Sequence, residues 1–188
     1  MKKNTKKIVT AAGIAAGTAA VASLSAYVTI KALIDTALDR EMPKVMEKAD
    51  KRISGEKSSD EFTNRMESAS ESLAVQPNET VEIIAHDGEK LVGHYFPCEK
   101  PERVIIAFHG WRSSWHRDFG MISDFWYKNN CSALYVEQRG QNNSSGEYMG
   151  FGLTERFDCL DWLNWEIERC GSDIPVYLAG VSMGATTV

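Results

Sequence analysis

The sequence predicts an α/β domain over residues 79–188, with a partly parallel sheet covered by helices. Two β-type runs, 80–86 and 90–97, flank Asp87-Gly88, a dipeptide typical of a tight hairpin. Three continuous apolar runs follow, as expected for strands buried on both faces: 103–109, 131–137 and 175–181. Helical patterns separate these runs, so we expect strand–helix–strand–helix–strand order with right-handed crossovers.

Two helices are predicted between the apolar strands. The first covers residues 115–129, and its apolar side is expected to carry Phe119, Ile122, Phe125 and Trp126. Thr154 is a suitable N-cap for the second helix, which Gly171 ends. Helical spacing predicts that its inner face consists of Phe157, Leu160, Leu163 and Ile167.

Composition and charge exclude some classes of protein. The 188 residues suffice for one domain with appendages, and the net charge of −5 argues against a nucleic-acid partner. None of the four cysteines forms a C-x-x-C pair, which argues against a zinc ribbon or a thioredoxin-like site. We expect no metal and no cofactor. Buried free thiols are the simpler interpretation of the cysteines, and a disulfide stays open for a domain outside the cell.

The N-terminal region predicts a membrane anchor. Residues 8–30 carry no charge over 23 positions, about 35 Å as a helix, and Lys2, Lys3, Lys6 and Lys7 precede them. These lysines favour a single-pass segment (1–34) with the N-terminus inside and the domain outside. The alternatives are a signal peptide cleaved after the small-x-small sequence Ala20-Val21-Ala22, with secretion as its consequence, and a soluble helix.

Residues 35–78 are predicted to form a charged helical stalk. Apolar side chains recur there at helical spacing, from Leu38 to Ile53 and again from Phe62 to Leu73. Two amphipathic helices, either forming a stalk or packing on the domain, explain this pattern. A helix on a lipid surface is less favoured, because acidic residues are as common as basic ones.

The last apolar strand runs into Gly180-Val181-Ser182-Met183-Gly184, a G-x-S-x-G sequence. In this motif the serine occupies a sharp strand-to-helix turn, and the flanking glycines let the helix and a neighbouring strand approach. We therefore predict Ser182 as a catalytic nucleophile. The alternative is a Gly/Ser turn with no catalytic role.

A second motif, His109-Gly110-Trp111, follows the strand at 103–109. Acyl transfer needs two N–H groups directed at the developing oxyanion. We assign them to Met183, directly after the serine, and to Trp111, with Gly110 letting the loop turn. His109 is expected to brace this loop. The alternative, that it is the general base, is disfavoured because it would lie behind the oxyanion hole.

A third motif is Glu137-Gln138-Arg139-Gly140, followed by a Ser-rich loop. It resembles the D-x-R-G-x-G-x-S loop found in many α/β-hydrolases, with Glu137 in place of the usual Asp. Such loops brace the site. Arg139 is accordingly expected to hold loops by ion pairs more than to bind substrate.

Together these motifs resemble the α/β-hydrolase superfamily, and specifically bacterial membrane-anchored hydrolases with a prolyl-oligopeptidase-like or serine-aminopeptidase-like domain. Three stretches carry the resemblance: 108–111, 150–158 and 182–185. It implies the N-terminal part of an α/β-hydrolase sheet, preceded by the anchor and the stalk. It also implies hydrolysis of an ester, amide or short peptide bond in a small substrate.

The chain departs from this family in one respect. The family's catalytic Asp or Glu and then His follow the serine, whereas only six residues follow Ser182 here. We therefore assign no acid or base, and expect an inactive fragment of a longer hydrolase. The alternatives are a non-catalytic, membrane-anchored interaction module and an acyltransferase that uses the same serine.

Overall fold

The computed structural model describes residues 23–42, 44 and 60–188, and the chain divides into two compact units, Met1–Asp39 and Arg40–Val188. In the first unit, residues 23–38 form a helix. Of the helices in these described residues, none combines the length and the apolar character needed to cross a membrane. Most of the predicted anchor, residues 8–22, lies outside the described residues, as does stalk segment 45–59.

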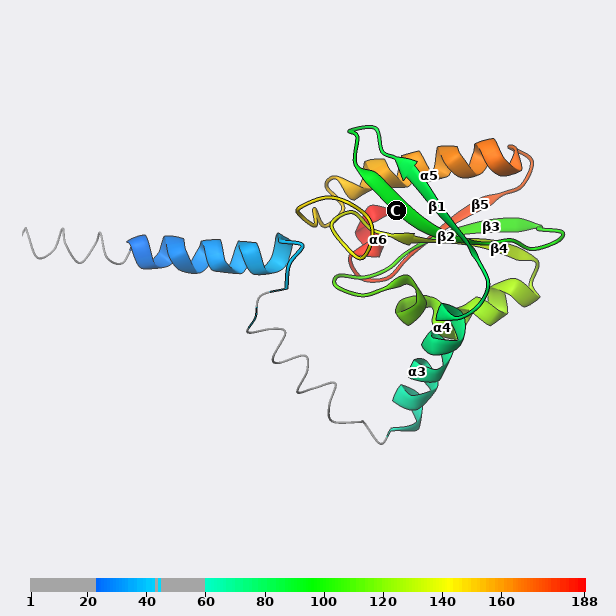
Figure 1. The fold of residues 1–188 in the computed structure, drawn as a ribbon, viewed down its shortest axis with the longest axis horizontal. Coiled ribbons are helices and arrows are strands. Elements are labelled where there is room, and N and C mark those ends of the chain that lie inside the picture. Colours follow the sequence, from blue (N-terminus) through cyan, green and yellow to red (C-terminus); the bar gives the residue numbers. More distant parts are fainter. Residues whose placement is uncertain (1–22, 43, 45–59) are drawn as a thin grey trace, which may run out of the picture. The chain divides into compact units, whose positions relative to one another are not determined.

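The second unit is built on a five-stranded mixed sheet, which confirms the predicted α/β class (Figure 1). The strands are β1 (Glu79–Ile84), β2 (Lys90–Phe96), β3 (Arg103–Phe108), β4 (Cys131–Glu137) and β5 (Val176–Gly180). Their order in the sheet is β1-β2-β4-β3-β5. Strands β1, β2 and β4 pair antiparallel, whereas β3 lies parallel to both β4 and β5.

The strands form where the sequence predicts them. The β1–β2 connection turns at Gly88, whose φ of +96° is accessible to glycine, and its register pairs Ile84 with Lys90. All seven residues of β4 are buried, as are five of the six in β3. Their continuous apolar runs therefore correspond to strands covered on both faces.

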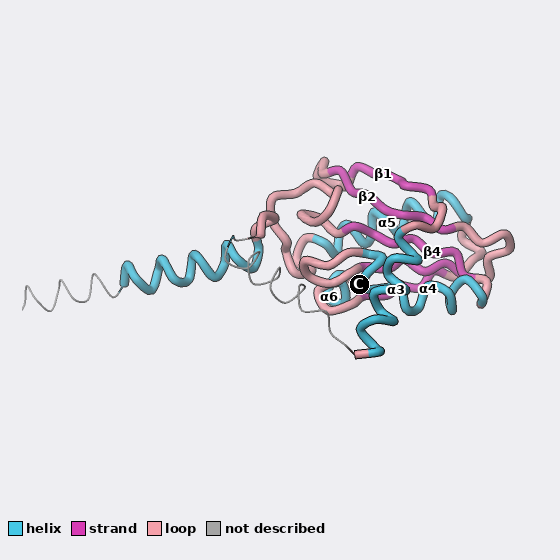
Figure 2. Tube along the Cα trace, turned by 60° about the horizontal axis from the view of Figure 1, so that its bottom comes forward, coloured by secondary structure: helices cyan, strands magenta, loops and turns pink. Residues whose placement is uncertain are grey.

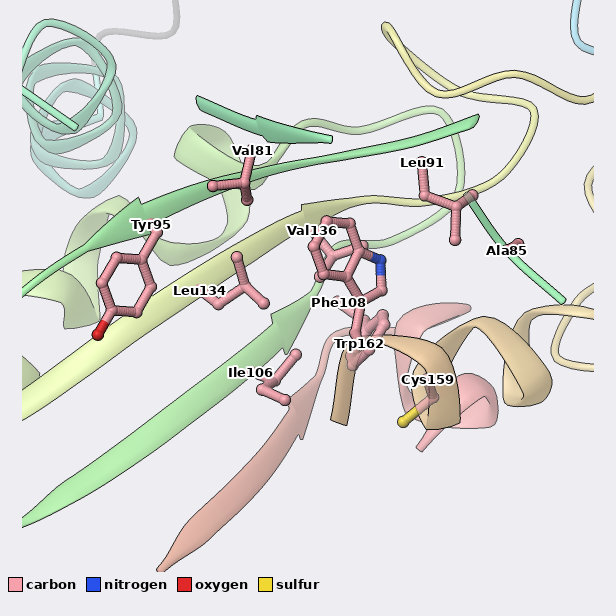
Figure 3. Packing of buried hydrophobic residues seen from close by; sticks show 10 residues of the cluster. All are labelled: Val81, Ala85, Leu91, Tyr95, Ile106, Phe108, Leu134, Val136, Cys159 and Trp162. Carbon is pink, nitrogen blue, oxygen red and sulfur yellow. The ribbon is translucent and has the colours of Figure 1, made fainter. Parts of the chain in front are cut away.

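The helices are α3 (Glu61–Ala74), α4 (Trp115–Lys128), α5 (Glu155–Cys170) and the short α6 (Gly184–Thr187). Helix α5 covers one face of the sheet, and α3 and α4 lie on the other (Figures 1 and 2). Under α5, Trp162 packs on Phe108, Leu134 and Val136 (Figure 3). On the opposite face, Trp115 and Phe119 pack with Tyr135.

Helix α3, the second half of the predicted stalk, packs on the domain. A Cβ placed on Gly120 of α4 would lie 2.7 Å from the α3 backbone at Ala69, so the two helices are in direct contact. Ser70 Oγ and His116 Nδ1 are 2.9 Å apart, and Leu73 is fully buried. Of the two arrangements expected for the stalk, packing on the domain therefore holds for this segment.

The predicted inner faces of the long helices are partly wrong. In α5, Leu163 packs against the core as predicted, but Phe157, Leu160 and Ile167 are exposed. The buried positions of α5 are Glu155, Asp158, Cys159, Trp162 and Glu166. In α4, Phe119 is buried and Trp126 packs against the core, but Ile122 and Phe125 are exposed. In α5 the cause is specific: Trp162 fills the space above the sheet, and the buried acids have hydrogen-bond partners, of which only Arg139, the partner of Asp158, is distant in the sequence.

Candidate active site

Ser182 lies in the turn between β5 and α6, where the prediction placed it. Its φ is +51°, in the left-handed region that a residue with a Cβ seldom adopts, and such strain costs about 1–3 kcal/mol. A Cβ placed on Gly180 would lie 2.3 Å from the Gly184 carbonyl oxygen. One placed on Gly184 would lie 2.0 Å from the Phe108 carbonyl oxygen. Both glycines are therefore required by close backbone approaches.

The loop after β3 lies against this turn. A Cβ added to Gly110 would lie 3.4 Å from the Ser182 Cβ and 3.4 Å from the Val181 carbonyl oxygen. The Gly110 N–H donates to Asp118 Oδ2 at 2.6 Å, which ties the loop to α4. Trp111 follows directly, and Met183 immediately precedes α6, whose first N–H group, that of Gly184, donates to the Val181 carbonyl oxygen at 2.8 Å. Met183 is therefore bonded directly to Ser182, and Trp111 follows Gly110, which lies against Ser182.

His109 is completely buried and fixed on both ring nitrogens. The Gln138 N–H donates to Nε2 at 3.2 Å, and the Asn142 side-chain amide lies 3.2 Å from the same atom. Nε2 is therefore an acceptor, which assigns the proton to Nδ1, 2.8 Å from the Gly110 carbonyl oxygen. Burial lowers the pKa of His109, so the ring is neutral. This geometry suits a loop brace and leaves no nitrogen to act as a base.

The other three histidines also have partners away from Ser182. His86 Nδ1 lies 3.0 Å from Asp161 Oδ2, and His94 Nε2 lies 2.8 Å from Glu137 Oε1. His116 lies between the hydroxyls of Ser70 and Ser114. Within residues 60–188, no histidine ring is hydrogen bonded to Ser182.

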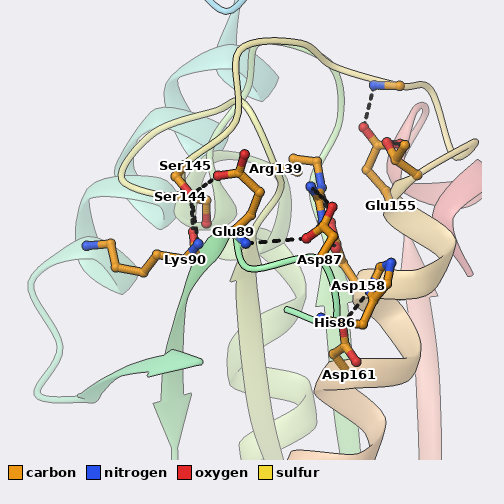
Figure 4. A network of polar contacts seen from close by, with 12 residues as sticks. His86, Asp87, Glu89, Lys90, Arg139, Ser144, Ser145, Glu155, Asp158 and Asp161 are labelled. Atoms are coloured by element: carbon orange, nitrogen blue, oxygen red, sulfur yellow. Dashed lines mark hydrogen bonds and ion pairs between the residues drawn. The ribbon is translucent and has the colours of Figure 1, made fainter. Parts of the chain in front are cut away.

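Arg139 is the centre of a charged network that joins three elements (Figure 4). Its guanidinium donates to Asp158 of α5 at 2.9 and 2.5 Å and to Asp87 of the β1–β2 turn at 2.6 and 3.1 Å. The hydrogen bond with Asp158 raises the pKa of Arg139, and the one with Arg139 lowers the pKa of Asp87. The side chain is 8% exposed and therefore has no open face for a substrate.

Glu137, which stands where related loops carry Asp, is buried and paired. It accepts hydrogen bonds from the backbone and side-chain N–H groups of Asn143, at 2.6 and 3.0 Å, and pairs with His94. Burial alone would raise the pKa of Glu137, but the bonds from His94 and Asn143 outweigh it and lower the pKa. This carboxylate therefore holds the loop after β4 in place.

Sequence reasoning missed two supporting residues. Gln138 is buried and hydrogen bonded to both His109 and Thr187. Glu155 accepts from the Gly150 and Gly152 N–H groups at 2.5 and 2.8 Å. The available signals were an acid one residue after the predicted N-cap and an amide next to Arg139, and neither identifies a partner.

One group of described residues has the composition of a metal site, namely His86, Asp158 and Asp161. Both carboxylate oxygens of Asp158 already accept from Arg139. The guanidinium charge therefore occupies the position where a cation would bind, and the group does not fit a metal ion.

Strand β5 ends in a strained serine turn, and the loop after its parallel neighbour β3 lies against this turn. These features define the class: this fold resembles the α/β-hydrolase superfamily. Solved structures agree. The esterase Pf2001 of Pyrococcus furiosus matches with a TM-score of 0.53 and 25% identity, over 62% of this chain and 46% of its own. The chain thus spans about half the length of that esterase.

Two other matches show the same fold. XC6422 of Xanthomonas campestris, described as an α/β serine hydrolase without a lid, has a TM-score of 0.52 at 17% identity, over 60% of this chain and 54% of its own. The α/β-hydrolase GrgF of Penicillium sp. sh18 has a TM-score of 0.50 at 20% identity, over 60% of this chain and 40% of its own. No protein-family profile and no curated protein matches the sequence.

Proposed function

We propose that this chain is the nucleophile-bearing part of a serine hydrolase that cleaves an ester, amide or short peptide bond. The observation that carries the proposal is Ser182 at a φ of +51° between two glycines that other residues could not replace. A strained non-glycine residue at a sheet edge points to function. The fold shared with esterases and serine hydrolases supports the same reaction class.

The proposed reaction needs a general base in addition to the described residues, since none of the described histidine rings contacts Ser182. Ser182 Oγ attacks the substrate carbonyl carbon as a general base takes the hydroxyl proton. The Met183 and Trp111 N–H groups stabilise the negative charge on the carbonyl oxygen. The tetrahedral intermediate then collapses, and the alcohol or amine leaves with that proton. Water, deprotonated by the same base, releases the acid from the acyl-enzyme and restores Ser182.

The test is covalent labelling. A fluorophosphonate should label the full-length gene product, and Ser182→Ala should abolish labelling. Ser144→Ala is a matched control, because Ser144 Oγ is buried in hydrogen bonds to Glu137 and Val92. Labelling that persists in Ser182→Ala would refute the assignment.

A specific observation favours a second function, a non-catalytic interaction module. None of the four histidines, all of which are described, contacts Ser182 through its ring nitrogens. A serine without a base is a weak nucleophile at neutral pH. In that case the full-length protein would resist the fluorophosphonate although it is folded.

We further propose that residues 8–30 anchor the protein in the cell membrane, with the N-terminus inside and the domain outside. The uncharged run behind four lysines supports this orientation. Protease added to intact cells should remove the domain and spare the N-terminus. A protected domain would contradict the orientation, and a mature N-terminus near Ala22 would indicate a cleaved signal instead.

A further inference from the structure

Gln138 occupies a position between the two elements that carry the predicted oxyanion donors. It directly follows β4 and is 2% exposed. Its side-chain N–H donates to the His109 carbonyl oxygen, two residues before Trp111. Its side-chain oxygen accepts from Thr187 Oγ1 at 2.6 Å, on α6 and one turn after Met183.

The His109 carbonyl oxygen can only accept, so it sets the direction of this amide, and a further contact joins the same two residues. The Gln138 backbone N–H donates to His109 Nε2, so both the backbone and the side chain of Gln138 are hydrogen bonded to His109. Thr187 is also buried, and its hydroxyl makes its shorter contact with the Gln138 oxygen, at 2.6 Å, and a longer one with the Met183 carbonyl oxygen, at 3.5 Å. In a buried site, removing either partner leaves a polar group unsatisfied, which keeps both bonds formed.

We propose that Gln138 is a positioning residue that fixes the separation of the two oxyanion donors, Trp111 and Met183. The inference rests on the proposed hydrolase function. The two ends of the Gln138 side-chain amide reach the two donor-bearing elements: the N–H contacts His109, and the oxygen contacts Thr187. Because N–H groups stabilise an oxyanion only within a narrow distance, a shift in either element lowers the rate and not substrate affinity.

The two hydrogen bonds of the Gln138 amide, to His109 and to Thr187, are its two arms, and each can be removed separately. Gln138→Glu keeps the shape and an acceptor for Thr187 but removes the donor to His109. Thr187→Val removes the hydroxyl at constant shape, and Thr187→Ser restores it. Ser132→Ala is the matched control: Ser132 is equally buried on β4, and its Oγ accepts from the Cys98 N–H at 3.0 Å at the other end of the strand.

The experiment measures kcat and KM for p-nitrophenyl acetate with the full-length gene product. Gln138→Glu and Thr187→Val should each lower kcat about 10- to 100-fold with KM changed less than about twofold. The double variant should be only slightly slower than the slower single variant, because both arms act on one geometry. Thr187→Ser and Ser132→Ala should retain kcat within about threefold.

The outcomes separate the two proposals. Wild-type protein without Ser182-dependent turnover overturns the hydrolase function, and the role of Gln138 with it. Active wild type in which the arm variants lose no more kcat than Ser132→Ala, or change KM alone, overturns only the role of Gln138. If Gln138→Glu does not fold, as judged by its melting temperature, the contrast between Thr187→Val and Thr187→Ser decides.

Discussion

The serine turn and helix α5 differ in how far their local sequence specifies them. At the turn, the spacing of Gly180, Ser182 and Gly184 corresponds directly to close backbone approaches. On α5, three of the four apolar residues predicted to face the core are exposed, and acids are buried instead. The close approaches at the turn involve backbone atoms, whereas each buried acid of α5 depends on the particular donor that lies opposite it.

The partners of the buried acids explain the inversion. Asp158 pairs with Arg139, 19 residues away, and Glu155 is satisfied by the N–H groups of Gly150 and Gly152. Glu166 has only the Cys170 thiol as a partner for Oε1, at 2.8 Å. A buried charge is tolerated when it is paired, so the face of α5 follows the pairing as well as the hydrophobic pattern.

The largest effect is expected for Gly184→Ala. The new Cβ would overlap the Phe108 backbone at 2.0 Å, so α6 must move away from β3, at a cost of about 4 kcal/mol or more. Gly171→Ala is the control: its φ of +78° and ψ of 172° strain any residue with a Cβ, but that Cβ meets nothing within 4 Å, and about 1–3 kcal/mol is expected. Urea unfolding of the 188-residue protein measures both. Similar losses of unfolding free energy for the two variants would mean that close backbone contact does not explain why the turn needs glycine.

Next in size is Asp158→Asn, which breaks half of the Arg139 network. We expect a loss of about 3 kcal/mol in unfolding free energy, because a buried guanidinium keeps only the half-exposed Asp87 as a charged partner. Asp161→Asn, three residues further along α5, should cost less than about 1 kcal/mol, since its partner His86 is exposed. Equal losses of unfolding free energy for the two variants would mean that ion pairing does not determine which face of α5 is buried.

The comparison of the serine turn with α5 also shows which features of the molecule can be predicted from the sequence. Strand limits, the hairpin at Gly88 and the place of Ser182 in a strand-to-helix turn were predictable, because they depend on local periodicity and glycine spacing. The bridge from His109 through Gln138 to Thr187 was not, because it joins three segments whose side chains meet only in the fold. The roles assigned to Trp111 and Met183 stay predictions.

A smaller effect of opposite sign is expected for Glu166→Gln. Burial raises the pKa of Glu166 above its ordinary value of 4.5, and Oε2 has no hydrogen-bond partner. A raised folded pKa means that this group's stabilising contribution is complete below pH 4.5 and is lost as pH rises through the folded value. The variant should therefore be about 1–2 kcal/mol more stable than wild type at pH 8, with the gain vanishing at pH 4. A gain of equal size at both pH values would contradict the buried, titrating carboxyl.

The smallest effect, and the most direct test of the α5 face, is expected for Leu160→Gln. Leu160 is 54% exposed, so its replacement should change the unfolding free energy by no more than about 0.5 kcal/mol. The adjacent Cys159 is 4% exposed and packs in the core under α5. Cys159→Ser should cost about 1–3 kcal/mol, because it buries a hydroxyl in an apolar setting. Paired unfolding curves for these two neighbours decide which side of α5 faces the sheet. A greater loss for Leu160→Gln would restore the face predicted from hydrophobic spacing, and the buried acids would then need another explanation.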